Sequence, residues 1–423
     1  MVPVEIDRGL TYTGFREALE LVYAHVHPVG TEVIPVSGGV GRVPSEDVTA
    51  RISNPSGDVS LKDGFAVKSA DIAEASPGSP ARLRIIGHSF AGSPFEGEVR
   101  HGSAVGICSG APIPGGADAV VAIEFCAEAG IEARVSADAG PGRNILRAGE
   151  DLEAGSVIAG KGTVLLPGLL GLAAAGGRET IEVYRAPRVA MVAIGDEVVA
   201  PGGNLHPGQL YASNLVTTGA WLDAFRVPFT TAIVGDSRDA ITSELAGCLP
   251  GVDVLVTSGG AWLSERDLIA RVLGEMGWRK VFHHVRMGPG KGVIFGTLEG
   301  KPVFCLPGGP ASNEMAFLQL ALPGILRMAG LAGSPLPVIS ARLVKDVKSR
   351  HRDWTEFRDA MLSRDPDGRY LVTPYLQRSR LQAIARAHCL VCIPEGVDTL
   401  REGDDVPVQV LMPTFAGLSL ARD

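Results

Sequence analysis

The chain has 423 residues, which is long enough for about two to four separate domains. Its composition, 45% hydrophobic and 20% charged, is typical of a globular protein and excludes a disordered chain. The 39 Lys and Arg residues against 47 Asp and Glu residues give a net charge of −8. Such a chain has no overall electrostatic attraction to nucleic acid or to an anionic membrane, so we expect neither as a partner.

The N-terminus and the cysteines indicate the compartment. The first residues include Glu5 and Asp7 and lack the apolar segment of a secretory signal. The six cysteines are scattered, and the close pair Cys389 and Cys392 lies in an apolar run that predicts a strand. Residues three apart in a strand face opposite sides, which favours structural thiols over a disulfide framework or a zinc site. We therefore expect a cytoplasmic protein.

The first part of the chain predicts one helix followed by a β domain. The apolar spacing of residues 13–24 predicts an amphipathic helix with Thr13 as its N-cap, and a short strand follows at 32–36. Short apolar runs between Gly, Pro and Ser clusters then predict a small β domain, with strands at 65–67, 83–86, 104–107 and 119–123. A short apolar helix with Pro167 near its start is expected at 165–175.

Strands and helices alternate between about residues 187 and 330, which predicts a mostly parallel sheet with helices on both faces. The strand candidates are 189–194, 231–234, 252–257, 281–285, 293–295 and 303–306. The helix candidates are 213–222, 238–249, 265–276 and a helix from Ala311 that we expect to break at Pro323.

The C-terminal part predicts strands again. A linker rich in Gly and Pro is expected at 332–337. The strand candidates that follow are 338–344, 357–362, 370–373, 389–393 and 406–411. They predict a small β barrel or sandwich.

Ligands of an open α/β sheet bind beyond the carboxyl ends of its strands, so the loops after the strands are the first candidates for a site. The strand candidate at 252–257 runs into Ser258, Gly259 and Gly260, and the next helix begins at an S-x-x-D capping pattern that ends at Asp267. Glycine lets backbone N–H groups approach a ligand closely, and a helix N-terminus favours a phosphate or another oxyanion.

Other loops bring further groups to the same predicted edge. Pro307 and Gly308 begin a second glycine-rich loop before a helix, Asp196 and Glu197 follow the strand at 189–194, and Lys291 supplies a cation. Carboxylates beside phosphate-binding loops repel one another unless a counter-ion is present. The pattern therefore predicts a divalent cation that bridges carboxylates and phosphate.

Each of these features also has a purely structural interpretation. A glycine-rich turn between strand and helix is common, and Asp196, Glu197, Asp236 and Asp267 also fit the role of exposed helix or turn caps. The segment around Lys291 is not a P-loop, because Val285 and Gly292 replace the glycine and the Ser or Thr that a P-loop needs.

Several motifs, in order along the chain, resemble the MoeA-type molybdopterin molybdenumtransferases, a family that includes the C-terminal part of gephyrin. Residues 58–66, DVSLKDGFA, are similar to the family's DNSAMDGYA, and residues 109–121, SGAPIPGGADAVV, to TGAPxPxGADAVV. Residues 147–151 match RxxGED with one residue fewer, and residues 195–197 match GDE. The series continues with GQLYASN at 208–214, TSGG at 257–260, PGK at 289–291 and PG at 307–308.

This resemblance implies an α/β multidomain fold. Its parts would be a central three-layer α/β domain similar to MoaB and MogA, an inserted N-terminal β domain, a mixed linking domain and a small C-terminal β barrel. The expected boundaries are 1–50 with 145–185 for the linking domain, 51–144 for the β domain, 186–331 for the α/β molybdopterin-binding domain and 336–415 for the barrel. The resemblance also implies a homodimer whose active clefts each lie between the β domain of one subunit and the α/β domain of the other.

The function implied is a step of molybdenum cofactor synthesis, the Mg²⁺-dependent insertion of molybdate into adenylylated molybdopterin with release of AMP. Transient contact with other proteins of cofactor synthesis is implied as well. The catalytic candidates carried over from the family motifs are Asp58, Ser109 and Asp151 on one wall of the cleft and Glu197, Asp236 and Asp267 on the other.

The resemblance also implies a role for each loop. Mg²⁺ held by Glu197 and Asp267 would polarise the scissile phosphoanhydride. The backbone amides of Ser258, Gly259 and Gly260 would hold the molybdopterin phosphate with Lys291 close by. The other candidates for contact with molybdopterin are Pro307, Gly308 and a serine of the C-terminal domain, Ser379.

The chain departs from the family pattern in the expected lining of the oxyanion site. Gly288 and His284 stand where the family has lysines, Ile194 where it has threonine and Ala212 where it has aspartate, and Trp262 lies in a replaced segment after SGG. Two permanent charges are thereby lost, since histidine titrates near neutrality. Other interpretations therefore stay open: a different oxyanion such as tungstate, a non-catalytic carrier of molybdopterin or finished cofactor, or an interaction scaffold.

Overall fold

The computed structural model describes residues 11–260, 268–375 and 380–411. Contacts within the chain divide it into two compact units. The first, here the α/β–barrel unit, comprises residues 1–32, 41–45 and 183–423, and the second, here the N-terminal β unit, comprises residues 33–40 and 46–182. Among the described helices, none is long and apolar enough to cross a membrane.

A six-stranded sheet forms the centre of the α/β part. Its strands lie in the order β17 (Phe229–Val234), β14 (Val189–Ile194), β18 (Val254–Ser258), β22 (Lys301–Leu306), β21 (Ile294–Leu298) and β19 (Arg279–His283). The first four strands are parallel, and β21 and β19 add to them in antiparallel pairs. The mostly parallel sheet predicted from the sequence is confirmed.

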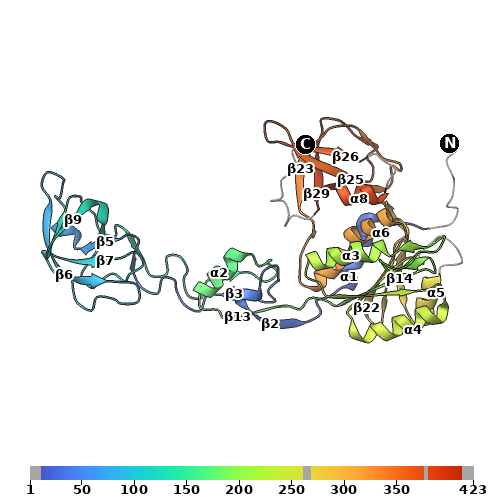
Figure 1. The fold of residues 1–423 in the computed structure, drawn as a ribbon, viewed down its shortest axis with the longest axis horizontal. Helices are drawn as coiled ribbons and strands as arrows, with labels where there is room; N and C mark the ends of the chain where they lie inside the picture. Colours follow the sequence, from blue (N-terminus) through green and yellow to red (C-terminus); the bar gives the residue numbers. More distant parts are fainter. Residues whose placement is uncertain (1–10, 261–267, 376–379, 412–423) are drawn as a thin grey trace. The chain divides into compact units, whose positions relative to one another are not determined.

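Helices cover both faces of this sheet. All six residues of β14 are buried, and they alternate between two apolar clusters. One cluster includes side chains of α1 (Phe15–His25), α3 (Ser213–Ala224), α6 (Pro310–Ala316) and α7 (Leu322–Met328). The other includes side chains of α4 (Arg238–Cys248) and α5 (Leu268–Glu275). Figure 1 shows α1, α3 and α6 on one side of the strands and α4 on the other, which is the three-layer arrangement expected.

The expected strand at 281–285 is in fact two strands. β19 ends at His283, and β20 (Val285–Gly288) begins after His284, whose φ of +67° turns the chain. β20 leaves the central sheet and pairs with β1 (Thr13–Gly14) and with a strand of the C-terminal barrel. A positive φ at a histidine has no periodicity signal, so the sequence pattern did not indicate this turn.

Two expected helix ends are wrong. Thr13 lies in β1, and Gly14 is the N-cap of α1, with its N–H donating to the Glu17 carboxylate at 3.2 Å. The helix from Pro310 does not break at Pro323, because a π turn at Phe317–Ala321 precedes α7. Pro323 then stands in the first turn of α7, where a missing N–H costs no hydrogen bond.

The C-terminal strands form a closed barrel rather than a sandwich. β25 (Thr355–Arg364) pairs with β26 (Tyr370–Pro374), followed by β23 (Val338–Leu343), β29 (Asp405–Val410) and β27 (Cys389–Ile393), which pairs back with β25. The sequence did not predict α8 (Arg380–Arg386) or the short pair β24 (Val347–Lys348) and β28 (Thr399–Leu400). Burial raises the pKa of Cys389 to about 12 and that of Cys392 to about 11, as expected for inert structural thiols.

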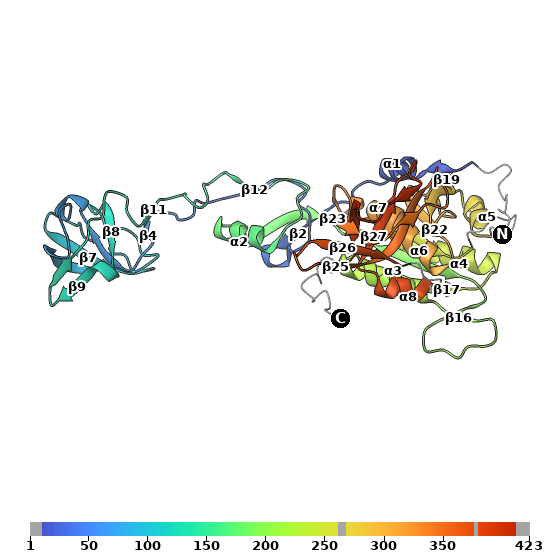
Figure 2. The same ribbon diagram turned by 90° about the horizontal axis from the view of Figure 1, so that it is seen from above.

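The N-terminal β unit is built on a second six-stranded sheet. Its order is β8 (Ala119–Ala122), β5 (Gly64–Val67), β7 (Ser103–Ile107), β6 (Ala81–Ser89), β10 (Glu132–Val135) and β9 (Cys126–Ala129). The four predicted strands are present, and the β9–β10 hairpin is additional. Figure 2 shows β4 (Val59–Ser60) and β11 (Ile145–Leu146) beside each other, and they pair with antiparallel register.

The remaining elements are short. In the N-terminal β unit, β3 (Val48–Thr49) pairs with β12 (Val157–Ala159), and α2 (Pro167–Ala175) begins with proline as predicted. β2 (Thr31–Pro35) pairs with β13 (Thr180–Tyr184), and β15 (Val198–Val199) with β16 (Leu210–Tyr211). The four domain boundaries expected from the sequence remain a prediction, because the contacts resolve only the two larger units.

Candidate functional site

Two glycine loops meet at the carboxyl edge of the central sheet. Gly259 follows β18 with a φ of +92°, and a Cβ there would lie 2.5 Å from the carbonyl oxygen of Ile194. A Cβ on Gly308, which follows β22, would lie 3.6 Å from the Gly259 Cα. Glycine is therefore required at 259 for both conformation and space, and the two loops predicted separately from the sequence are adjacent.

The backbone amides of these loops are not all available to a ligand. The N–H of Gly259 donates to the carbonyl oxygen of Leu306 at 3.1 Å. The N–H of Gly260 makes no hydrogen bond to the described residues. The expectation that Ser258, Gly259 and Gly260 all present amides is thus wrong for Gly259, because its amide links the two loops to each other.

Two asparagines that the sequence analysis did not single out hold this edge together. Asn214 on α3 donates to Ser258 Oγ at 3.1 Å and to the carbonyl oxygen of Gly308 at 2.8 Å. Asn313 on α6 donates to the same Ser258 Oγ at 3.0 Å and to the carbonyl oxygen of Pro307 at 2.9 Å. Asn214 ends the GQLYASN motif, which was a usable signal, whereas nothing in the local sequence marks Asn313.

Carboxylates stand at the ends of the neighbouring strands. Asp196 and Glu197 follow β14, Asp236 follows β17, and all three are exposed. The Asp236 N–H donates to Asp196 Oδ1 at 3.0 Å, and the Asp196 N–H approaches Asp236 Oδ2 at 3.5 Å. The structure therefore joins Asp196 and Asp236, while the Glu197 carboxylate folds back over Gly195, where it would lie 2.4 Å from an added Cβ.

These carboxylates fit part of a Mg²⁺ shell. Mg²⁺ prefers oxygen ligands and is usually held by one or two carboxylates together with substrate phosphates and water. Among the described residues, no group of three or more His, Cys, Asp or Glu side chains is placed to hold an ion alone. Glu197 fits as one carboxylate ligand, with the rest of the shell supplied by substrate and water.

Lys291 lies on a tight loop after β20. Its carbonyl oxygen accepts the N–H of Val285 at 2.9 Å, which folds the loop back on the strand. An added Cβ at Gly290 would lie 3.3 Å from both the carbonyl oxygen of Ser312 and the N–H nitrogen of Ala316, so this loop packs directly on α6. α6 begins directly after the Pro307–Gly308 loop. The Lys291 loop and the Pro307–Gly308 loop therefore both contact the same helix.

The N-terminal β unit brings its predicted residues together at the β4–β11 pair. Asp58 accepts the N–H of Ala148 at 2.9 Å and forms an ion pair with Arg147. The Ala148 N–H, with Arg147, lowers the pKa of Asp58 against a smaller effect of burial, so this carboxylate is ionised at neutral pH. Arg147 belongs to the RxxGED-like motif but was not among the candidate site residues.

Ser109 and Asp151 lie in loops attached to the same pair. The N–H of Ser109 donates to Asp63 Oδ1 at 2.7 Å, and the β-bridge between Val59 and Pro112 ties the Ser109 loop to β4, which directly follows Asp58. Asp151 is exposed in the turn after Arg147, next to the bridge between Asn54 and Leu152. Asp58, Ser109 and Asp151 thus stand on neighbouring segments of one unit.

Comparisons with known proteins cover almost the whole chain. Family models match the MoeA N-terminal region (domain I and II) at residues 13–177, a probable molybdopterin binding domain at 190–327 and the MoeA C-terminal region (domain IV) at 340–411. A Mycobacterium tuberculosis protein named molybdopterin molybdenumtransferase 2 is 31% identical over 382 residues, 89% of this chain and 94% of that protein. This chain belongs to the MoeA family.

Further relatives agree with this membership. The molybdopterin molybdenumtransferase of Bacillus subtilis is 30% identical over 392 residues and covers 90% of both chains. The crystal structure of a molybdopterin biosynthesis MoeA protein from Pyrococcus horikosii superposes with a TM-score of 0.78 at 32% identity, covering 95% of this chain and 99% of that one.

The departures from the MoeA pattern have different structural settings. His284 is 3% exposed, and its ring stacks on that of His283 at 3.7 Å. Gly288 has room for a side chain, since an added Cβ would lie 3.6 Å from Glu356 and 4.0 Å from Trp354. Ile194 and Ala212 are buried in the two clusters of the sheet. Of the two lost lysine positions, only 288 can therefore take a larger side chain without displacing the core.

Three sequence-based predictions fall outside the described residues. These are the metal ligand Asp267, the C-terminal serine Ser379 and the departure Trp262. Their roles stay predictions.

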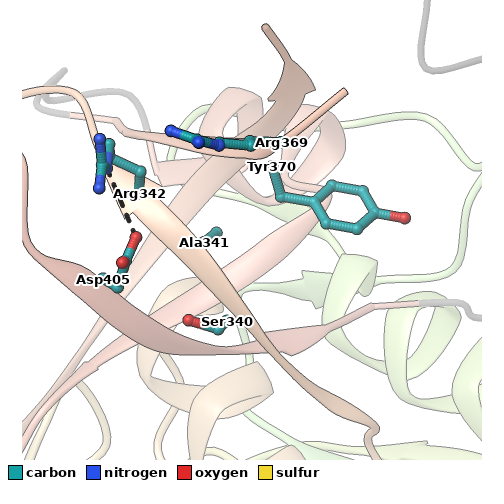
Figure 3. Close-up of a pocket in the computed structure, with 6 residues that line it drawn as sticks. All are labelled: Ser340, Ala341, Arg342, Arg369, Tyr370 and Asp405. Atoms are coloured by element: carbon teal, nitrogen blue, oxygen red, sulfur yellow. Dashed lines mark ion pairs between the residues drawn. The ribbon is translucent and has the colours of Figure 1, made fainter. Parts of the chain in front are cut away.

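Two hollows of the α/β–barrel unit contain none of the predicted site residues. One, of about 480 Å³, lies between β23 and β26 and is lined by the six residues labelled in Figure 3. There, Arg342 pairs with Asp405 at 3.5 Å. The other, of about 570 Å³, lies beside the start of α1, where Arg286 pairs with Glu395 at 3.4 Å. Because neither hollow contains a residue of the family motifs, the MoeA family loops at the sheet edge remain the candidate site.

Proposed function

We propose that this chain inserts molybdate into adenylylated molybdopterin and releases AMP, in a reaction that requires Mg²⁺. The curated relatives that match it are named molybdopterin molybdenumtransferases, and residues 190–327 match a probable molybdopterin binding domain. The observation that carries the proposal is the meeting of two glycine loops at the carboxyl edge of the sheet, with Glu197 after the neighbouring strand β14 and the Lys291 loop packed on α6.

In this proposal the glycine loops bind the phosphate of molybdopterin. The Gly260 N–H donates to a phosphate oxygen, and the Lys291 ammonium adds a positive charge. Asn214 and Asn313 keep Ser258 and the Pro307–Gly308 loop in place, so the site is formed before the ligand arrives. Such preorganisation lowers the entropy cost of binding.

Cleavage breaks the P–O bond between the molybdopterin phosphate and AMP while an oxygen atom of water bonds to the molybdopterin phosphorus, and negative charge develops on the departing AMP. Glu197 would hold Mg²⁺, with Asp267 as the predicted second ligand, and the bound cation would stabilise that charge. The carboxylates of Asp196 and Asp236 each accept the other's backbone N–H, which ties the loop that carries Glu197 to the loop after β17.

The oxyanion step is where this chain would differ from its relatives. Gly288 contributes no charge and His284 is buried, so Lys291 is the cation that the described β20 loop offers to molybdate. We therefore expect weak molybdate use, and tungstate, an oxyanion of the same charge, is the alternative substrate.

A homodimer completes the proposed site. Asp58, ionised and paired with Arg147, would stand with Ser109 and Asp151 on the wall supplied by one subunit. The glycine loops and Glu197 would form the wall supplied by the other.

The test is AMP release from adenylylated molybdopterin with molybdate and Mg²⁺, compared between the wild type, Glu197→Gln and Glu20→Gln. Glu20 is exposed on α1 and serves as the matched control. We expect turnover in the wild type and in Glu20→Gln, and a loss of at least about a hundredfold in Glu197→Gln. If the wild type binds molybdopterin tightly but releases no AMP, the enzyme hypothesis is rejected in favour of a non-catalytic carrier.

A further inference from the structure

We propose that Trp354, which the C-terminal barrel supplies, is the positioning residue for the ammonium group of Lys291. This inference rests on the proposed function, because it concerns the cation assigned there to phosphate and oxyanion binding. The Lys291 Nζ lies 5.9 Å from the centre of the Trp354 ring. That separation is within the range at which an ammonium is attracted to the face of an indole.

The contact leaves the charge of Lys291 available to a ligand. Among the described residues, no carboxylate pairs with this ammonium. A carboxylate partner would neutralise the lysine, whereas an aromatic face orients it and keeps its full positive charge. Gly288 and His284 stand where the MoeA family has lysines, so a partner that orients the remaining ammonium group without neutralising it favours anion binding.

Strand pairing between the two parts of the unit brings Trp354 to this place. β20 runs parallel to β25, with Met287 opposite Thr355 and Gly288 opposite Glu356. Trp354 directly precedes β25, so it lies beside the loop that leads from Gly288 to Lys291. The indole lies against Gly288, 4.0 Å from where a Cβ on that residue would be.

Neighbouring rings restrict the indole. Tyr12 lies 5.5 Å from the Trp354 ring and His351 lies 4.8 Å from it, both centre to centre and both tilted. Aromatic rings at these separations attract one another beyond simple burial.

Glu356 anchors the loop that carries Trp354. It is 1% exposed, and one of its oxygens accepts the N–H groups of Arg350 at 2.6 Å and His351 at 2.9 Å and the hydroxyl of Ser349 at 3.1 Å. Its other oxygen pairs with Arg358. Burial alone would raise the pKa of Glu356, but Arg358 and these N–H donors outweigh it and lower the pKa, so the anchor stays ionised.

The first test is a double-mutant cycle on AMP release with Trp354→Ala and Lys291→Met. We expect Trp354→Ala to raise KM by about three- to tenfold while kcat stays within about twofold, and Trp354→Phe to stay near the wild type, because phenylalanine keeps an aromatic face. In the Lys291→Met background, Trp354→Ala should add nothing. An equal effect of Trp354→Ala in both backgrounds would overturn the proposal.

A second readout does not depend on catalysis. The chain has four tryptophans, so the fluorescence of Trp354 is obtained by subtracting the spectrum of Trp354→Phe. Lys291→Met should change this component, because it removes a charge from the indole face. An unchanged component would overturn the positioning role even in an active enzyme. Absence of AMP release from the wild type would instead refute the proposed function and leave this readout to decide on Trp354.

Discussion

At the scale of single residues, Glu314 on α6 has a buried carboxyl group whose pKa is strongly shifted. It is 7% exposed and accepts the Trp221 indole N–H at 3.0 Å. Burial raises the pKa of Glu314 to about 7, the hydrogen bond from Trp221 opposes this, and the nearby charge of Asp359 adds to it. The pKa of Asp359 is itself raised by burial against the opposing effect of Arg358. The local sequence does not indicate this raised pKa, because Glu314 lies in an ordinary helical pattern.

The raised pKa of Glu314 predicts a pH dependence of stability. Between the usual pKa of about 4.5 and the folded value of about 7, the folded state holds a proton that the unfolded state has lost. The free energy of unfolding therefore falls as pH rises through this window, by about 2–3 kcal/mol for this group between pH 5 and pH 8. Glu314→Gln, which keeps an acceptor for Trp221, should lose this dependence in urea unfolding.

The matched control for this measurement is Glu20→Gln on the exposed face of α1. Its unfolding free energy should follow the wild type at both pH values. If Glu314→Gln also follows the wild type at pH 5 and pH 8, Glu314 does not carry the pH dependence.

Gly259 allows a second prediction at this scale. An alanine there needs a positive φ and places its Cβ against the Ile194 carbonyl, so Gly259→Ala should lower the free energy of unfolding by about 1–3 kcal/mol and reduce AMP release. Gly247 lies in α4 with no atom within 4 Å of an added Cβ. Gly247→Ala should therefore be neutral or stabilising by up to about 1 kcal/mol, and similar losses in both variants would contradict the explanation.

At the scale of elements, the candidate site depends on α6 as much as on the strands. The helix begins directly after the Pro307–Gly308 loop, packs against the Lys291 loop through Gly290, and carries Asn313 into contact with Ser258. One helix thus connects the loops after β18, β20 and β22. Sequence periodicity predicted the helix. It did not indicate the role of Asn313, which is 1% exposed and has no distinguishing local motif.

We predict that Asn313→Ala uncouples these loops. The change removes one of the two donors to Ser258 Oγ, the other being Asn214, and the donor to the half-buried Pro307 carbonyl, at a cost of about 1–2 kcal/mol in stability. The KM for adenylylated molybdopterin should rise in the same variant. Exposed Asn204 provides the control, and Asn204→Ala should change neither quantity. An unchanged KM in Asn313→Ala would show that the loops are positioned without it.

At the scale of the whole molecule, the predicted catalytic residues are divided between two units. Asp58, Ser109 and Asp151 belong to the N-terminal β unit, and Glu197 and Asp236 belong to the α/β–barrel unit. Each set is held by contacts inside its own unit. The proposed homodimer, in which each cleft takes one wall from each subunit, accounts for this division.

A complementation experiment tests the shared cleft. Asp58→Ala and Glu197→Ala homodimers should both be inactive. A mixture with free subunit exchange should recover about a quarter of wild-type activity, because half of the dimers are mixed and each mixed dimer has one intact cleft of two. Native mass spectrometry with differently tagged subunits verifies that mixed dimers form. Verified mixed dimers without activity would exclude a cleft of this kind.

The sequence alone determined the features that depend on local chemistry. Periodicity predicted β14 residue for residue, and the order of strands and helices predicted the three-layer sheet and the edge at which its loops meet. These features follow from side-chain alternation, helix periodicity and the special backbone freedom of Gly and Pro, all of which are read within a few residues. The motif resemblance added the family, which the comparisons confirm.

Only the tertiary structure decided which of these local features meet. Two contacts join segments that are far apart in the sequence: Asn214 and Asn313 share Ser258, and the indole of Trp354 lies over Lys291. A third feature, the buried His284 stacked on His283, lies at a turn that the strand pattern of the sequence did not indicate. Burial and strand pairing are set by the sum of many long-range contacts, so a single side chain carries no local record of its partner. For that reason the loops of the candidate site were predictable, whereas the residues that position them were not.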